Sequence, residues 1–458
     1  MTKKFHPETE SIRTQINRSE HFEHSNPIYL SSSFIFEDAE DMRASFAEEK
    51  QHNIYTRLSN PNNEELVQKL CKLEGAEAGV SFASGMSGIF TTFAALLSQG
   101  DHILSVRAVF GSTHSLFTKI LPKWGIQTTY FDYSDLDTLT NFILPETKIL
   151  FVESPTNPGL QIFDLELLGE FANKHNLIFI VDNCFATPYI QKPINYEAHI
   201  VLHSATKLID GQGRVLGGLA VGKEELMQEI KAFSRNTGPS LSPFNAWVLS
   251  KSIETLSIRL DKHCDNAFSL AQFLEDHPLV KTVRYPFLKS HPQYELARKQ
   301  MSKGGNIIAF EVEGGLKGGQ DFINHIEMCS LTSNLGDTRT IITHPASTTH
   351  SKLTPSERSL VGISDGLIRI SVGLENIDDI IDDISQALDA YSKKKPSLKL
   401  HSNLALKYCT PGRVRTPNPQ GRNLVLYPVE LRAHPYFGTS NIRNCTIRNT
   451  MKDCSYTW

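Results

Sequence analysis

Short runs of apolar residues that end abruptly at polar residues recur in the first half of the chain. The run Leu177–Val181 ends at Asp182, and the run His199–Leu202 is closely followed by Ser-Ala-Thr-Lys at positions 204–207. Runs of this length that are rich in β-branched residues are typical of buried parallel strands, and ligands of open α/β sheets bind where such strands end. The pattern therefore predicts that Asp182 and Lys207 lie at one edge of a sheet.

Similar runs alternate with helical patterns over residues 102–182. Strands are expected at 102–106, 126–131 and 149–152, and a further strand at 219–221. Helices are expected at 64–74, at 89–97, near 114–122, and from Asp135 and Asp164 onward. Alternation of this kind predicts βαβ units and a mostly parallel sheet, and therefore an α/β fold.

The second half of the chain predicts a smaller α+β domain, as expected for a chain too long for one ordinary domain. Helical patterns and apolar runs share this region, at 256–274, 317–327, 353–361 and 377–391 for helices and at 307–310 and 367–370 for strands. Residues 1–63 are mostly polar, which is typical of a segment that wraps a neighbour. The expected parts are this segment, a large domain at 64–255, a small domain at 256–394 and a tail at 395–458.

Charge separates the tail from the rest of the chain. The net charge of −4 gives no reason to expect nucleic acid or a membrane as partner. Residues 395–458, however, carry a net charge of +8 and six prolines, without clear periodicity. Such a segment has poor means of burying a core. Our hypothesis is that the tail is run-on translation past a lost stop codon or a frameshift, and a basic nucleic-acid-binding appendage is the alternative.

The N-terminal residues and the cysteines indicate the cellular compartment in which the protein is expected. The start, MTKKFHPETE, lacks the apolar region of a signal peptide, and no run approaches the roughly 18 apolar residues of a membrane span. The seven cysteines are odd in number and form no CxxC pair, which argues for reduced thiols and against a disulfide framework or a zinc site. We therefore expect a cytoplasmic protein without a metal.

The residue types at the predicted sheet edge suit pyridoxal 5'-phosphate. This cofactor needs a lysine that bonds to its aldehyde, an acid that keeps its ring nitrogen protonated, and donors for its phosphate. Lys207 and Asp182 match the first two needs, and the hydroxyls of Ser204 and Thr206 match the third. Taken singly, Lys207 reads as a surface lysine and Asp182 as a turn residue, but their combination favours the cofactor.

Two further stretches offer phosphate contacts. Tyr55 and Arg57 share one side of an extended segment, where a phenol and a guanidinium make a good clamp. The small-residue turn before the apolar helix exposes the N–H groups of Gly85 and Met86 at a helix start. An ordinary surface pair and an ordinary buried helix start are the respective alternatives.

Three residues are candidates for contacts with the cofactor ring or the substrate. Phe110 could stack its ring on a flat cofactor, or belong to the core. Asn157, after the strand at 149–152, could bond the phenolate oxygen, or shape a turn beside two prolines. Arg369 lies between apolar residues and needs a partner. A substrate carboxylate and an internal salt bridge are equally compatible with it.

Together these residues resemble a known family, the pyridoxal-phosphate enzymes of cysteine and methionine metabolism. The resemblance covers roughly residues 10–391 and rests on seven ordered motifs, YTR at 55–57, SGM at 84–86, ESPTNP at 153–158, DN at 182–183, SATK at 204–207, HPA at 344–346 and RISVGLE at 369–375. It implies the aspartate-aminotransferase-like fold, called fold type I. It also implies a homotetramer built from tight dimers, in which Tyr55 and Arg57 reach the partner's active site.

Within that family, the segments 203–218 and 333–340 are most similar to O-succinylhomoserine sulfhydrylases. Phe110 replaces a common stacking tyrosine, and Asn334 stands where a serine often helps hold the substrate carboxylate. Leu58 and Ser115 stand where cystathionine synthases tend to carry arginines that could grip cysteine. The resemblance thus implies a small sulfide nucleophile.

The implied reaction is γ-replacement, which converts O-succinylhomoserine and sulfide to homocysteine and succinate in methionine biosynthesis. Lys207 would act as the base and acid that moves protons, and with Phe110 in place of a phenol it would do so alone. Cystathionine γ-synthase, a γ-lyase and O-acetylhomoserine sulfhydrylase are the alternatives within the family. A catalytically inactive relative with a binding role is the alternative of another class.

Overall fold

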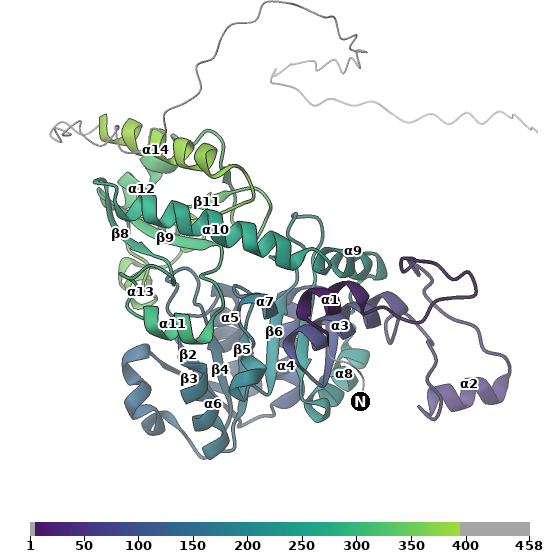
Figure 1. Cartoon of the computed structure of the whole chain (residues 1–458). Helices are drawn as coiled ribbons and strands as arrows, with labels where there is room; N and C mark the ends of the chain where they lie inside the picture. The colour runs from purple at the N-terminus through teal and green to yellow at the C-terminus, as the bar shows by residue number, and fades with distance from the viewer. Residues whose placement is uncertain (1–4, 394–458) are drawn as a thin grey trace, which may run out of the picture. The chain divides into compact units, whose positions relative to one another are not determined.

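The computed structural model describes residues 5–393 (Figure 1). Within these residues, seven strands form a sheet in the order β1-β7-β6-β5-β4-β2-β3. The strands are β1 Ala78–Phe82, β2 His102–Val106, β3 Gln127–Phe131, β4 Thr147–Glu153, β5 Ile178–Asp182, β6 Ile200–Ser204 and β7 Gly218–Gly222. Strand β7 is antiparallel to both β1 and β6, and the other neighbouring strands of this sheet pair in parallel. The predicted α/β fold with a mostly parallel sheet is confirmed.

Helices cover this sheet and share its buried apolar side chains, such as Leu66, Phe93 and Phe151. They include α3 Pro61–Glu74, α4 Gly85–Leu96, α6 Leu165–Lys174, α8 Glu224–Thr237 and α9 Pro243–Ile253. The short helix α7 Thr187–Ile190 instead packs in a separate apolar cluster with Leu256 and Leu260. The start of α3 is set by Asn60, whose side chain accepts the Asn62 N–H. Such caps satisfy the first N–H groups of a helix and fix where the helix begins.

Two of the expected helices take other forms. The helix expected near 114–122 is a short α-helix, α5 Gly111–Ser115, followed by a π-turn at Leu116–Ile120 and a 3-10 turn at Leu121–Trp124. Pro122 explains the break, because proline lacks the N–H that continues an α-helix. The helix expected from Asp135 is a 3-10 helix over Tyr133–Phe142. Its many Asp, Ser and Thr side chains bond to nearby backbone and so compete with α-helical bonding.

A second, five-stranded sheet lies in the later part of the described chain, in the order β10-β11-β12-β9-β8. Its strands are β8 Val280–Arg284, β9 Ile307–Val312, β10 Ser330–Leu331, β11 Ile341–Thr343 and β12 Leu367–Ser371. Helices α10 Leu256–Glu275, α12 Gly315–Ile323 and α14 Ile377–Lys393 pack with it around a separate apolar core (Figure 1). The remaining helices are α11 Tyr294–Gln300 and α13 Pro355–Leu360.

The N-terminal segment contains two helices that its polar composition did not predict, α1 Pro7–Arg13 and α2 Ala39–Phe46. The first lies on α3, where Glu10 pairs with Lys72 at 3.0 Å. The second projects away from the rest of the protein (Figure 1). The tail expected at 395–458, with its proposed origin, lies outside the described residues.

No helix among residues 5–393 combines the length and hydrophobicity needed to cross a bilayer.

Candidate active site

The site begins at the carboxyl ends of three neighbouring strands. Glu153 ends β4, Asp182 ends β5 and Ser204 ends β6. Glu153 lies directly opposite Asp182 in the parallel pairing, and Asp182 lies opposite Leu202. Lys207 follows β6 by three residues. The structure therefore brings the predicted carboxylate and the loop of the predicted lysine to the same edge of the sheet.

Asp182 is a buried carboxylate, 9% exposed, without a salt-bridge partner among the described residues. Its Oδ1 accepts the N–H of Cys184 at 3.0 Å. Burial raises the pKa of Asp182 to about 6, while the Cys184 N–H and the positive charge of His203 oppose this rise. A buried acid of this kind gains most from a cationic ligand, such as a protonated ring nitrogen.

Lys207 lies in a half-buried position against a neutral partner. Its Nζ donates a hydrogen bond to Oδ1 of Asn334 at 2.6 Å. Burial lowers the pKa of Lys207; Cys184 opposes this effect and the positive charge of Arg369 adds to it. The neutral amine is the form that attacks an aldehyde, so these surroundings favour the chemistry expected of this lysine.

Arg259 supports the loop that carries Lys207. The Arg259 side chain is 6% exposed, and its Nη1 and Nη2 donate to the carbonyls of Leu208 at 2.8 Å and Ile209 at 3.2 Å. From the second sheet's side, Thr338 N donates to the Gly211 carbonyl at 2.9 Å. The lysine loop is thus fixed from both sides, as a site on a rigid scaffold requires.

Arg369 approaches the same edge from β12. It is 4% exposed, and its Nη1 and Nη2 donate to Asn157 Oδ1 at 3.2 Å and to the Asn334 carbonyl at 3.0 Å. Its Nε is buried without a partner. No carboxylate pairs with Arg369 anywhere in residues 5–393, so the internal salt bridge offered as an alternative does not form there. The unpaired donor suits an anionic ligand.

The start of α4 lies tightly against Ser204. A side chain added at Gly85 would place its Cβ 2.7 Å from the Cβ of Ser204. The Ser84 hydroxyl caps α4 by accepting the Ser87 N–H, while the N–H groups of Gly85 and Met86 have no acceptor inside the helix. Together with the Ser204 hydroxyl they form an anion cradle that fits a phosphate.

Thr206 lies two residues beyond Ser204, and its hydroxyl is already engaged. It accepts the N–H of Gly217 at 3.1 Å. This bond connects the lysine loop to the chain just before β7. The same hydroxyl donates to the Gly217 carbonyl at 3.3 Å. Thr206 would therefore donate to a phosphate only by exchanging this second bond, since a hydroxyl has a single proton.

Glu153 is a buried acid at this edge that the sequence analysis did not single out as a site residue. Its two carboxyl oxygens accept the N–H groups of Phe110 at 2.8 Å and Asn157 at 3.1 Å. Burial and the negative charge of Asp182 raise its pKa. Glu153 therefore holds the two loops that carry the predicted ring contacts. Two signals pointed to it: its place at the end of an apolar run, the same place that Asp182 takes, and its place at the start of the ESPTNP motif.

The ring of Phe110 lies at the surface of this edge. It is 44% exposed, so it does not belong to the core. Asn157 is placed with its Oδ1 on Arg369, next to the Asn334 loop. Glu153 thus joins two of the predicted ring contacts, Phe110 and Asn157. Arg369 joins Asn157 to Asn334, and Asn334 in turn bonds Lys207.

Tyr55 and Arg57 stand apart from the others. The Arg57 guanidinium lies 5.4 Å from the Tyr55 ring centroid and donates to the Arg235 carbonyl. The Tyr55 side chain is 42% exposed. Within the part of the chain that the structure describes, no hydrogen bond or ion pair joins these two residues to the other predicted cofactor residues.

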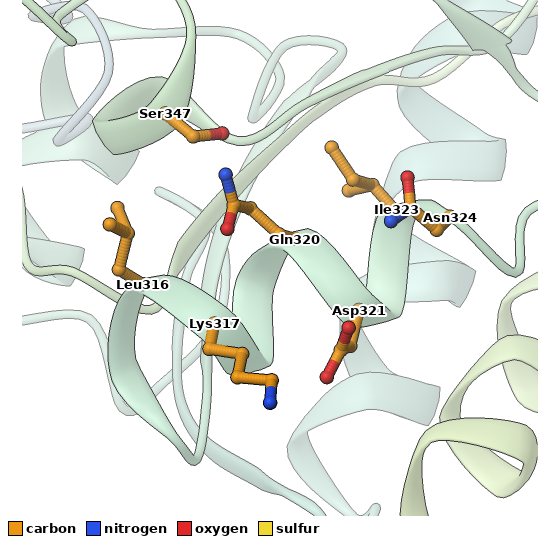
Figure 2. Close-up of a pocket in the computed structure, with 7 residues that line it drawn as sticks. All are labelled: Leu316, Lys317, Gln320, Asp321, Ile323, Asn324 and Ser347. Atoms are coloured by element: carbon orange, nitrogen blue, oxygen red, sulfur yellow. The ribbon is translucent and has the colours of Figure 1, made fainter.

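An open hollow of about 630 Å³ lies elsewhere, along α12. Figure 2 shows Gln320 pointing from this helix toward Ser347, with Lys317 and Asp321 on the same helix. None of the predicted site residues lines it. We therefore place the candidate site at the edge of the seven-stranded sheet and not in this hollow.

Comparisons with known proteins identify the enzyme family to which the chain belongs. Residues 8–389 match the family described as Cys/Met metabolism PLP-dependent enzyme. The chain is 45% identical over 383 residues to an O-succinylhomoserine sulfhydrylase of Pseudomonas aeruginosa, covering 84% of this chain and 95% of the relative. It is 44% identical over 369 residues to an L-methionine gamma-lyase of Porphyromonas gingivalis, and this match covers 80% of this chain and 92% of the relative.

Solved structures agree with this class. A putative O-acetylhomoserine (thiol)-lyase of Campylobacter jejuni, which carries a pyridoxyl-lysine phosphate, matches with a TM-score of 0.80 at 34% identity, covering 84% of this chain and all of that one. MetB of Corynebacterium glutamicum matches with a TM-score of 0.78 at 35% identity, and this match covers 84% of this chain and 99% of MetB. The chain belongs to the family of pyridoxal-phosphate-dependent enzymes of cysteine and methionine metabolism, with the fold-type-I architecture.

Proposed function

We propose that this enzyme converts O-succinylhomoserine and sulfide to homocysteine and succinate. The observation that carries the proposal is the buried Arg369 guanidinium, whose unpaired Nε offers a site for an amino-acid carboxylate beside Lys207 and Asn334. The relative that is 45% identical and named O-succinylhomoserine sulfhydrylase supports the choice of substrate.

Each residue has a defined task in this proposal. Bound pyridoxal phosphate supplies an electron sink that makes the substrate Cα–H acidic. The Gly85 and Met86 amides, with Ser204, Thr206 and the Tyr55–Arg57 pair, hold its phosphate. Asp182 keeps its ring nitrogen protonated. Phe110 covers its ring, and Asn157 bonds the phenolate oxygen.

Lys207 moves the protons. Burial lowers the pKa of Lys207, and its Nζ bonds a neutral amide, so its amine gives up a proton more readily than that of an exposed lysine and can act as a base. The Phe110 side chain has no ionisable group, so it cannot share this task. Arg369 and Asn334 hold the substrate carboxylate and thereby aim its Cα–H at Nζ.

A γ-elimination is the second candidate, because a relative of 44% identity is named as an L-methionine gamma-lyase. The two activities are separated by a steady-state assay of the succinyl and acetyl esters, each with sulfide or cysteine, and of methionine alone. We expect homocysteine from the succinyl ester and sulfide at the highest kcat/KM. Release of 2-oxobutyrate from methionine as the fastest reaction would instead identify a lyase, and cystathionine formation would identify a synthase.

We further propose that two copies of the chain complete each other's sites, within a homotetramer. Tyr55 and Arg57 do not meet the rest of the site in their own chain, and the segment before them exposes large apolar side chains. These are Phe22, Leu30, Ile35 and Phe46, with exposed fractions of 81%, 66%, 91% and 54%. Exposed apolar groups of this size mark a surface that binds another protein.

Subunit mixing tests this assembly. Lys207→Ala chains and Tyr55→Phe/Arg57→Ala chains should each be inactive, whereas their co-expressed mixture should regain about a quarter of wild-type activity, because half of the pairs are hybrid and each has one complete site. The control is a chain that carries all three substitutions, which should give no regain with Lys207→Ala chains. A mixture without activity would contradict the shared site.

A further inference from the structure

Glu153 has no partner of opposite charge, although it is a buried acid at the centre of the candidate site. It ends β4 and lies opposite Asp182, the last residue of β5. It is 5% exposed, and no ion pair joins it to a cation of residues 5–393. Its role must therefore be sought in the hydrogen bonds that its two carboxyl oxygens accept.

These two oxygens bind two different loops. Oε2 accepts the N–H of Phe110 at 2.8 Å, and Oε1 accepts the N–H of Asn157 at 3.1 Å. Phe110 directly precedes α5, 43 positions before Glu153, whereas Asn157 lies in the loop that follows β4. One side chain at the end of a buried strand thus anchors both loops to the sheet.

Each anchored loop carries one of the predicted contacts with the cofactor ring. The Phe110 side chain is 44% exposed, so its ring is available for stacking. The Asn157 side chain accepts the Arg369 guanidinium at its Oδ1, at 3.2 Å. Its Nδ2 has no acceptor among the described residues and can donate to a phenolate oxygen.

We propose that Glu153 is a positioning residue that holds the Phe110 ring and the Asn157 amide at fixed places relative to each other, so that the cofactor ring meets both at once. The proposal rests on the ring contacts assigned to these two residues under the proposed function. Glu153 itself does not touch the cofactor. Its effect is preorganisation, because loops that are already ordered cost less binding free energy than loops that must be ordered by the ligand.

Glu153→Gln removes one of the two anchors. A carboxyl group offers two acceptor oxygens, whereas an amide offers one oxygen and an NH₂ group that would face the second N–H donor. The substitution changes little in shape, and the apolar side chains of β4 stay buried, so the fold should persist. Glu153→Ala is the second variant, because it removes both anchors without placing a donor against a donor.

The measurement is the dissociation constant of pyridoxal phosphate from the full-length protein, near neutral pH. Glu153→Gln and Glu153→Ala are each made in the wild type, in Phe110→Ala, in Asn157→Ala and in the protein with both alanines. We expect Glu153→Gln to weaken binding about tenfold in the wild type and less than about twofold in the protein with both alanines. A purely structural role would weaken binding equally in all four backgrounds.

Ser204→Ala is a background in which the full effect should remain. Ser204 ends β6, two strands from β4 and therefore about 10 Å away, and it shares no hydrogen-bond partner with Glu153. The visible spectrum of the bound cofactor gives a second signature. It should change in Glu153→Gln in the same direction as in Asn157→Ala, because both leave the phenolate oxygen without a fixed donor.

Asp383→Asn is the matched control, because Asp383 is also 5% exposed and accepts backbone N–H groups, at residues 327–329. It should lower the thermal midpoint of unfolding without weakening cofactor binding. Unchanged binding in both Glu153 variants, or a tenfold loss that persists without the Phe110 and Asn157 side chains, would overturn the proposal. Normal binding in Phe110→Ala and Asn157→Ala would refute the ring contacts and the proposal together, but would leave the choice of ester and nucleophile standing.

Discussion

Replacement of Lys207 by alanine is expected to abolish turnover and the visible absorbance of the bound cofactor together. The physical reason is that one amine serves both purposes, as the covalent link to the aldehyde and as the base at the substrate Cα. With Phe110 unable to take a proton, no second base compensates. We expect a loss in kcat of at least about 10³-fold.

The fold should survive this substitution. Among the described residues, the Lys207 side chain makes one hydrogen bond, to Asn334 Oδ1 at 2.6 Å, and its loss costs about 1–3 kcal/mol. Thermal unfolding followed by circular dichroism would show this. The matched control is Lys174→Ala, a change of an exposed lysine on α6, which should keep both turnover and colour. A Lys207→Ala protein with normal turnover would contradict the assignment of the site.

The sequence predicts most of the seven-stranded sheet because its strands are continuous apolar runs. The strand expected at 102–106 is β2 with the same bounds, and β5 and β6 lie within one or two residues of their expected places. Strand β8, Val280–Arg284, escaped prediction because its side chains are only partly buried, and it carries Lys281 and Arg284. Strands β10 and β11 are too short to leave a pattern.

In the candidate site, residues at the ends of strands could be predicted from the sequence, whereas contacts between residues far apart in the chain could not. Asp182 and Lys207 could be predicted because each ends a strand-like run, and parallel strands deliver their ends to one edge. The contacts of Glu153 with Phe110 and of Glu74 with His203 join residues 43 and 129 positions apart. No spacing rule connects such positions, because only the folded sheet makes them neighbours.

Replacement of Asp182 by asparagine is expected to weaken cofactor binding and to lower kcat by about 10²–10³-fold, as for other losses of one electrostatic stabiliser. An amide is nearly isosteric with the carboxylate, and its oxygen can still accept the Cys184 N–H. It cannot keep a ring nitrogen protonated. The visible spectrum and the dissociation constant of pyridoxal phosphate measure the effect. Asp383→Asn is the control, because Asp383 is also buried and accepts backbone N–H groups, at residues 327–329, yet belongs to the small sheet's core.

The same substitution should change how the stability of the cofactor-free protein depends on pH. Burial raises the pKa of Asp182 to about 6, above its value of about 4 in an unfolded chain. The folded state therefore binds the proton more tightly, and wild-type stability should fall as pH rises from about 4 to above 6, by on the order of 2–3 kcal/mol from this group. Asp182→Asn should lack this decrease, so that above pH 7 the cofactor-free variant is the more stable protein in urea unfolding, although it binds the cofactor less well. If the unfolding free energies of the two proteins depended on pH in the same way, ionisation of Asp182 would not destabilise the folded state. There would then be no reason to expect a cationic ligand beside Asp182.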